Sequence, residues 1–154
     1  MNNSDDWFGF WIGQQPALCL RITYLSQEGP FHRFRAEAEA PGFKGSFNFI
    51  ARLGEFEAFR DQVKRMYETL RGTAQFASIE DHVTVDATID RLGHVFWKIA
   101  LSSHGHTAPT SPELTFSIEE DQTLLWNVAA KIEDMLEWLS EQAARQACAR
   151  LLLL

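Results

Sequence analysis

The amino-acid sequence predicts an α+β fold: a curved, mainly antiparallel sheet of about six to eight strands with two helices, at about residues 53–71 and 121–149. Two segments have apolar residues at helical spacing, whereas the segments between them alternate apolar and polar residues. The strands are not each followed by a crossover helix, so the sheet is expected to be mainly antiparallel. The 154 residues suit one domain of ordinary size, and we expect a single domain over residues 1–154.

The part of the chain before the first helix is expected to form a meander. Strong turn signals, Glu28-Gly29-Pro30 and Pro41-Gly42, divide it into short segments with strand character. These segments span residues 16–26, 31–40 and 43–52. A further short strand is expected at residues 7–12.

Both helices are predicted from apolar side chains that recur every three or four residues and therefore share one face. The first stripe consists of Leu53, Phe56, Phe59, Val63, Met66 and Leu70. The second consists of Leu125, Val128, Ile132, Met135 and Leu139. Gly72 is expected to end the first helix. The carboxylate of Asp121 is expected to cap the second by accepting free amide hydrogens of its first turn.

The segment from His82 to Ser102 predicts a hairpin with a defined register. Its turn, residues 90–94, fits a three-residue loop in which Gly93 takes the left-handed position. This turn pairs apolar residues on one face: Ile89 with Val95, Ala87 with Trp97, Val85 with Ile99 and Val83 with Leu101. It pairs mostly polar residues on the other: Asp90 with His94, Thr88 with Phe96, Asp86 with Lys98 and Thr84 with Ala100. One face is thus expected in the core and the other in water. Residues 73–79 and 113–119 are expected to add strands.

The polar face of this hairpin is the predicted site of partner binding. Phe96 is an aromatic residue among polar neighbours, and aromatic residues with a polar rim are typical anchors of protein interfaces. We therefore predict a partner-binding surface of Asp86, Asp90, His94, Phe96 and Lys98. The alternative is that a helix or the N-terminal segment packs over this face and buries Phe96.

Composition and charge argue against a nucleic-acid partner, a membrane span and secretion. The formal net charge of −7 provides no positive field that would gather phosphates, so nucleic acid is not expected as a partner. No apolar stretch has the length of a membrane span, and the acidic N-terminus does not resemble a signal peptide. With only two cysteines and no disulfide framework, the expected location is the cytoplasm.

No pattern in the sequence indicates catalysis, a cofactor or a metal. His104-Gly105-His106 offers two metal ligands where a site needs three or four, so a polar loop is the favoured interpretation. Cys19 lies in an apolar run, where a thiol is inert. The acidic cluster at residues 119–121 is interpreted as helix capping. We therefore expect a protein that is not an enzyme.

Several short motifs in a fixed order resemble the WapI-type bacterial immunity proteins. They are the helix from Leu53 through Leu70-Arg71-Gly72 with Ala74, the turn Asp90-Arg91-Leu92-Gly93-His94-Val95, Leu114-Thr115-Phe116, and Asp121-Gln122-Thr123-Leu124. The resemblance covers roughly residues 40–139 and leaves out the first forty residues and the tail from about Ser140. It implies a small cytoplasmic protein that protects a bacterium by binding the toxic domain of a neighbour. It implies no catalytic residues.

Two functions from different classes follow. The leading one is a non-catalytic immunity protein that binds and neutralises a cognate toxin domain. The alternative is a small-molecule-binding protein that uses the aromatic-lined interior of a curved sheet. Normal packing of Trp97, Phe47, Phe49 and Phe116 would argue against the alternative. An enzyme would require a cleft that brings His104 or His106 close to carboxylates. The sequence leaves the oligomeric state open.

Overall fold

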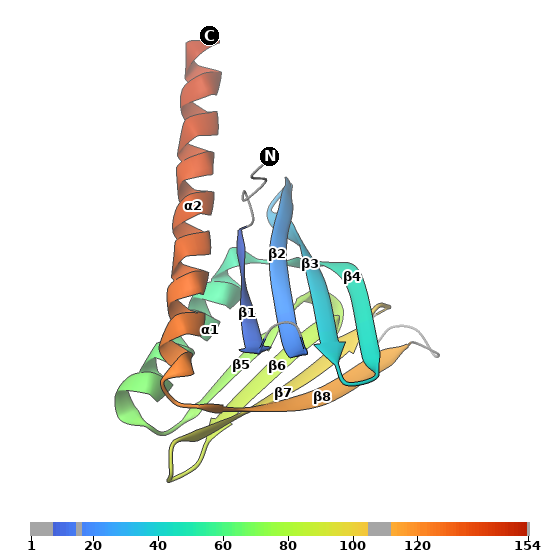
Figure 1. Ribbon diagram of the computed structural model, residues 1–154. Coiled ribbons are helices and arrows are strands. Elements are labelled where there is room, and N and C mark those ends of the chain that lie inside the picture. The colour runs from blue at the N-terminus through green and yellow to red at the C-terminus, as the bar shows by residue number, and fades with distance from the viewer. Residues whose placement is uncertain (1–7, 15–16, 105–111, 154) are drawn as a thin grey trace, which may run out of the picture.

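A computed structural model describes residues 8–14, 17–104 and 112–153. In these residues the chain forms two four-stranded antiparallel sheets and two long helices (Figure 1). The first sheet has the order β1-β2-β3-β4 and the second β5-β6-β7-β8. The strands are β1 (Gly9–Gln14), β2 (Leu18–Glu28), β3 (Phe31–Ala40), β4 (Phe43–Ala51), β5 (Thr73–Ala77), β6 (Val83–Ile89), β7 (His94–Ser102) and β8 (Glu113–Asp121). The helices are α1 (Leu53–Thr69) and α2 (Leu124–Leu152), with a short 3-10 helix η1 (Ile79–Asp81) before β6.

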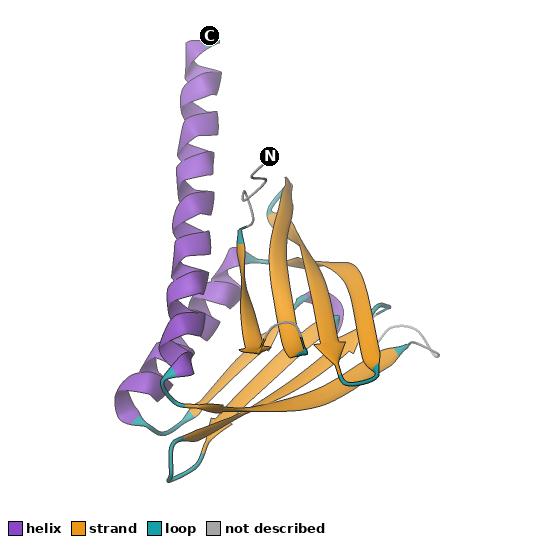
Figure 2. Cartoon of the chain, viewed as in Figure 1, coloured by secondary structure: helices purple, strands orange, loops and turns teal. Residues whose placement is uncertain are grey.

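The predicted α+β class with mainly antiparallel strands is confirmed. The eight strands are divided between two sheets because α1 separates the β1–β4 meander from the β5–β8 meander. The two sheets are stacked across one another, and both helices lie at one end of this stack (Figure 2). No helix in the described ranges has the combined length and apolarity needed to cross a membrane.

One hydrophobic core joins the two sheets and the two helices. Contacts between aromatic rings connect the two sheets through this core. The Phe34 ring of β3 lies 4.7 Å from that of Phe56 on α1, which stacks at 4.6 Å on Phe76 of β5. Phe59, also on α1, contacts Trp97 of β7 with the ring centroids 6.3 Å apart. Helix α1 therefore contacts both sheets from one end of the stack, and its predicted apolar stripe supplies the buried face.

The predicted register of the β6–β7 hairpin is confirmed at every pair from Val83 with Leu101 to Ile89 with Val95. Gly93 has a φ of 84°, in the left-handed region that a three-residue loop requires. The Asp90 side chain stabilises the turn because its Oδ1 accepts the backbone N–H of Leu92 at 2.8 Å and that of His94 at 2.9 Å. The apolar face is buried, and Trp97 is fully enclosed.

The predicted helix ends were less accurate. Helix α1 stops at Thr69 because Leu70, two residues before Gly72, already adopts the left-handed conformation. Helix α2 begins at Leu124, and Asp121 is the last residue of β8. The Asp121 carboxylate accepts the backbone N–H of Thr123 at 2.9 Å, so it shapes the turn before α2 and does not cap the helix. Helix α2 also continues past Ala149 to Leu152.

Candidate functional site

The outer face of the second sheet is an open, mostly polar surface. Alternation along each strand directs the odd-numbered residues of β5 and β8 and the even-numbered residues of β6 and β7 to this face. Register places Gln75, Asp86, Lys98 and Ser117 in one row across the sheet. The adjacent row contains Thr73, Thr88, Phe96 and Glu119. All four strands contribute, so the face spans the whole sheet.

Phe96 is the aromatic residue at the centre of this face. Its side chain keeps 41% of its surface exposed, whereas the next residue, Trp97, is fully buried on the other side of the same strand. The described elements therefore leave Phe96 uncovered, while residues 1–7 of the N-terminal segment, the other covering element of the alternative, lie outside the described residues. The exposed ring lies between polar neighbours, Thr88 on β6 and Glu119 on β8.

The five predicted partner-binding residues lie on one face. Asp86 and Lys98 face each other in the row beside Phe96. Asp90 and His94 lie at the turn end of the hairpin, where Asp90 Oδ2 is 3.0 Å from His94 Nδ1. The backbone hydrogen bond from His94 holds the pKa of Asp90 below its usual value, so this carboxylate is ionised at neutral pH. The turn end of the face therefore carries a fixed negative charge.

Glu120 is a buried acidic residue that the sequence interpretation missed. It is 8% exposed and lies on the inner side of β8. Its Oε2 accepts the indole N–H of Trp97 at 3.1 Å, and it also accepts the backbone N–H of Gly13 from β1. Burial raises the pKa of Glu120, while these two hydrogen bonds act in the opposite direction. The alternation of Leu114, Phe116 and Ile118 toward the core continues to residue 120, so this pattern could have placed Glu120 on the inner side.

The acidic cluster at residues 119–121 thus has three separate roles, which corrects its interpretation as helix capping. Glu119 is exposed opposite Phe96, Glu120 links the two sheets, and Asp121 shapes the turn before α2. Beside Glu120, the ammonium of Lys131 lies 3.9 Å from the centre of the Trp11 ring. The space at this point is only about 70 Å³, too small for a cofactor.

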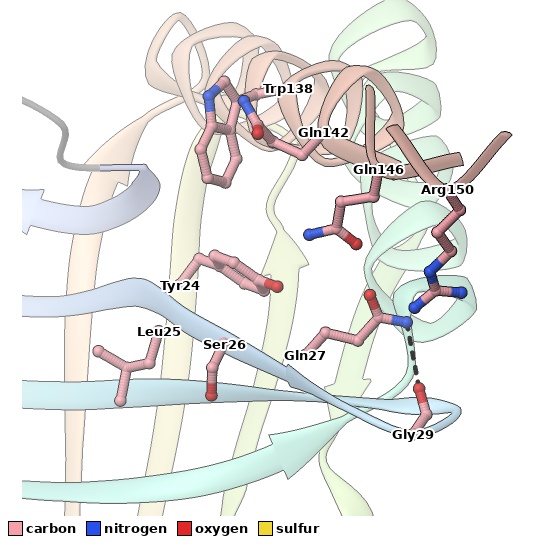
Figure 3. A pocket seen from close by; sticks show the side chains of 9 residues that line it. All are labelled: Tyr24, Leu25, Ser26, Gln27, Gly29, Trp138, Gln142, Gln146 and Arg150. Atoms are coloured by element: carbon pink, nitrogen blue, oxygen red, sulfur yellow. Dashed lines mark hydrogen bonds between the residues drawn. The ribbon is translucent and has the colours of Figure 1, made fainter. Parts of the chain in front are cut away.

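A second surface feature is a groove between α2 and the β2–β3 hairpin, with a volume of about 700 Å³ (Figure 3). Trp138, Gln142, Gln146 and Arg150 form its helical wall. The opposite wall is the end of β2 and the hairpin turn from Tyr24 to Gly29. Its lining is dominated by side-chain amides, together with two aromatic rings and one guanidinium. This groove opens on the surface, outside the packed interior.

The aromatic interior that the small-molecule alternative requires is filled. Trp97 is 0% exposed and Phe49 2% exposed. Phe47 and Phe116 are partly buried and packed against the core. The packing of Trp97 and Phe49 therefore goes against a ligand cavity at the centre of the core. A pocket of about 300 Å³ does lie where β4 of the first sheet meets β7 and β8 of the second, lined by Phe43, Phe47, Leu101 and Leu114 among others.

The candidate metal and nucleophile residues do not assemble a site within the described ranges. His104 is exposed, and His106 lies outside the described residues. Among the residues that the structure describes, no group of three or more histidine, cysteine, aspartate or glutamate side chains could hold a metal. Cys19 is buried, and burial raises the pKa of its thiol, as expected for an unreactive cysteine, whereas Cys148 is exposed on α2.

Comparison with known proteins identifies a family that matches most of the chain. The family model described as the immunity protein WapI-like family matches residues 5–140. The match includes the first strands, which the sequence motifs did not cover, and it ends where the tail of α2 begins. No match was found among the curated proteins or among the solved structures.

Proposed function

Because the chain belongs to the immunity protein WapI-like family, we propose that it is a non-catalytic protein that binds and neutralises a cognate bacterial toxin domain. The family match over residues 5–140, which includes all eight strands, is the observation that carries this proposal. We further propose that the protein acts in the bacterial cytoplasm.

The outer face of the second sheet is the proposed toxin-binding surface. Phe96 is its anchor because an exposed aromatic ring with polar neighbours gains most from being covered by a partner. Asp86, Asp90, His94 and Lys98 form the surrounding polar rim. Asp90 is held by the hairpin turn, so it is ordered before binding and little conformational entropy is lost there.

The charge of the chain favours a basic partner. A net charge of −7 accelerates the approach of a positively charged domain through long-range attraction. The carboxylates Asp86, Asp90 and Glu119 bring part of this charge to the proposed surface. We therefore expect the toxin domain to present a basic surface to the outer face of the second sheet.

The test uses the product of the adjacent reading frame as the candidate toxin, because immunity proteins are usually encoded beside their toxins. Phe96→Ala should keep the fold and weaken binding by about 1 to 3 kcal/mol, the range for an interface anchor. Asp86→Lys and Asp90→Lys should mainly slow association, and more strongly at low salt, because exposed charges act through a screened field. Asp90→Lys also removes the turn hydrogen bonds to Leu92 and His94, so Asp86→Lys is the cleaner test of charge. Surface plasmon resonance at two salt concentrations measures these rates.

Phe43→Ala is the matched control. Phe43 is 65% exposed on β4 of the other sheet, so this variant removes an exposed phenylalanine away from the proposed surface. It should leave both rates unchanged. Unchanged rates in Phe96→Ala, Asp86→Lys and Asp90→Lys would remove this face as the binding surface. Failure of the wild type to bind, and to rescue growth of cells that express the candidate, would exclude that candidate as the partner.

A further inference from the structure

Gly45 lies inside β4 at a position where the backbone does not require glycine. Its φ lies outside the left-handed region, and a Cβ added at this position would meet nothing within 4 Å. A glycine inside a strand weakens the strand, and it often marks a place where a ligand or another backbone approaches closely. The folding of β4 therefore does not explain why glycine occupies this position.

Gly45 lines the mostly apolar pocket of about 300 Å³ between the two sheets. Phe43 and Phe47, its neighbours on the same face of β4, form one side of this pocket, and Phe43 is largely exposed. Leu101 of β7 and Leu114 of β8 form the side that belongs to the second sheet. The volume is at the lower limit for a small-molecule site, so the pocket suits one large apolar side chain better than a cofactor.

Strand β4 is also an edge of the first sheet, and within the described ranges it pairs with β3 alone. Ala40 and Phe43 flank the two-residue loop of the β3–β4 hairpin and therefore form a hydrogen-bonded pair. The residues that alternate with Phe43 turn their backbone N–H and C=O groups away from β3. These residues are Lys44, Ser46, Asn48 and Ile50. Each of them can donate one hydrogen bond to an added strand and accept another.

The other three sheet edges are protected against pairing with a further strand. Helix α2 lies along β1 (Figure 1). Gln62 of α1 occupies the edge of β5, because its Oε1 accepts the backbone N–H of Gln75 at 2.7 Å. Strand β8 carries four acidic residues, and charged side chains on an edge strand oppose pairing. Strand β4 has a single charged residue, Lys44, and its ammonium is already paired with Glu39 at 3.1 Å.

We propose that the free edge of β4 binds an extended segment of a partner protein, which joins the first sheet as a further strand antiparallel to β4. Backbone hydrogen bonds to Lys44, Ser46 and Asn48 supply affinity, and a large apolar side chain opposite Gly45 enters the pocket and supplies specificity. The two residues beside this anchor lie opposite Lys44 and Ser46 on the exposed outer face of the sheet, so they are polar. This site is separate from the proposed toxin-binding face on the second sheet and does not depend on the proposed immunity function.

A phage-displayed library of random peptides of nine residues, the length of β4, provides the probe. Peptides selected on the wild type should carry one large apolar residue between polar neighbours. Fluorescence anisotropy then measures the dissociation constant of the synthetic peptide. Methylation of the backbone nitrogen of either residue beside the anchor should raise this constant at least about tenfold, because those N–H groups point to β4. Methylation of the nitrogen of the anchor residue, which points away from β4, is the matched control and should have little effect.

Gly45→Val tests the pocket. Valine fills the space beside residue 45 without a clash and favours a strand, so the free energy of unfolding should not fall. The dissociation constant of the peptide should rise at least about tenfold, because the anchor side chain then overpacks the pocket. Gly54→Ala is the matched control, since it adds a Cβ at an equally open glycine on α1, and it should bind the peptide as wild type does.

Ser46→Pro tests the strand edge. Proline removes an N–H that points away from β3, and an edge strand tolerates proline at such a position. The dissociation constant should rise at least about tenfold, since one backbone hydrogen bond is lost and the proline ring obstructs the edge. Ser46→Thr keeps the N–H and should bind as wild type does. Urea denaturation of each variant confirms that the fold is retained.

Three results would overturn the proposal. A library that yields no peptide with a preference for wild type over Gly45→Val would exclude the pocket as the anchor site. Equal binding to wild type and Ser46→Pro would exclude pairing with the edge. Equal effects of methylation at the anchor and at its neighbours would exclude the antiparallel strand. Phe96→Ala should bind the peptide as wild type does, and Gly45→Val should leave the toxin rates unchanged, so failure of this proposal is distinguishable from failure of the toxin-binding proposal.

Discussion

Replacing Trp97 by phenylalanine should destabilise the protein in a way that depends on the ionisation of Glu120. The indole N–H of Trp97 donates to Glu120 Oε2 at 3.1 Å, and phenylalanine lacks this donor. A hydrogen bond to a charged acceptor contributes about 1.5 to 3 kcal/mol. The smaller ring adds about 1 kcal/mol through incomplete filling of a fully buried position. The free energy of unfolding of Trp97→Phe should therefore fall by about 2.5 to 4 kcal/mol while Glu120 is ionised.

The effect should be smaller at low pH. Burial raises the folded-state pKa of Glu120 above its unfolded value, so folding favours the protonated carboxyl. The protonated Glu120 carboxyl therefore makes its full contribution to the free energy of unfolding at pH values below the unfolded-state pKa. This contribution is lost as the pH rises through the folded-state pKa. Loss of the Trp97 donor raises the folded pKa further. Protonated Glu120 accepts only a neutral hydrogen bond, so the destabilisation should shrink by about 1 to 2 kcal/mol in acid.

Urea denaturation across a pH series, followed by far-ultraviolet circular dichroism, measures this effect. The matched control is a double-mutant cycle in which Trp97→Phe is introduced into the Glu120→Gln background. Glutamine does not titrate, so the destabilisation by Trp97→Phe should then be independent of pH. The same pH dependence in both backgrounds, or none in wild type, would refute the coupling between Trp97 and Glu120.

The remaining predictions concern the turn and the histidine loop. Gly93→Ala should lower the free energy of unfolding by about 1 to 3 kcal/mol, because a Cβ at this position meets Gln122 and the backbone is left-handed. Gly42→Ala has a similar φ of 81° and open space around it, so it should be less destabilising in the same chemical denaturation. Zinc or nickel should not raise the melting temperature if His104-Gly105-His106 is only a loop, since a ligand stabilises only the state it binds. A rise that disappears in His104→Ala would contradict this interpretation.

The parts of the fold that the sequence predicted are those set by nearby residues. The turn at Gly93 fixes the partner of every residue from Val83 to Leu101, because a hairpin loop determines its own register. The helical stripes likewise depend only on spacing, and all the buried residues of α1 belong to the predicted stripe. For the same reason the outward direction of Phe96 followed from the turn alone.

The division into two sheets could not be predicted in this way. It depends on which strands pair after α1, and that choice is made by contacts between residues far apart in the sequence. The role of Glu120 was missed for a related reason. The alternation of β8 places Glu120 on the inner side, but its partners Trp97 and Gly13 come from two other strands. The prediction that Asp121 caps α2 was wrong. Its carboxylate accepts a hydrogen bond from Thr123 in the turn before the helix, and the sequence does not specify the geometry of that turn.

Glu119 and Glu120 provide a test of whether the proposed binding face is rigid. The two residues are adjacent on β8 but lie on opposite sides of the sheet, Glu119 beside Phe96 and Glu120 beneath it on Trp97. Replacing the Glu120 carboxylate by a neutral amide weakens the inner hydrogen bonds and should change stability without moving the outer surface, because the β7–β8 ladder holds both strands. We therefore expect Glu120→Gln to leave toxin association and dissociation rates unchanged at temperatures well below its melting point. Stopped-flow binding at such a temperature measures both rates, with Phe96→Ala as the positive control. If Glu120→Gln also weakened binding, the face would be deformable and the expectation of a rigid face would be wrong.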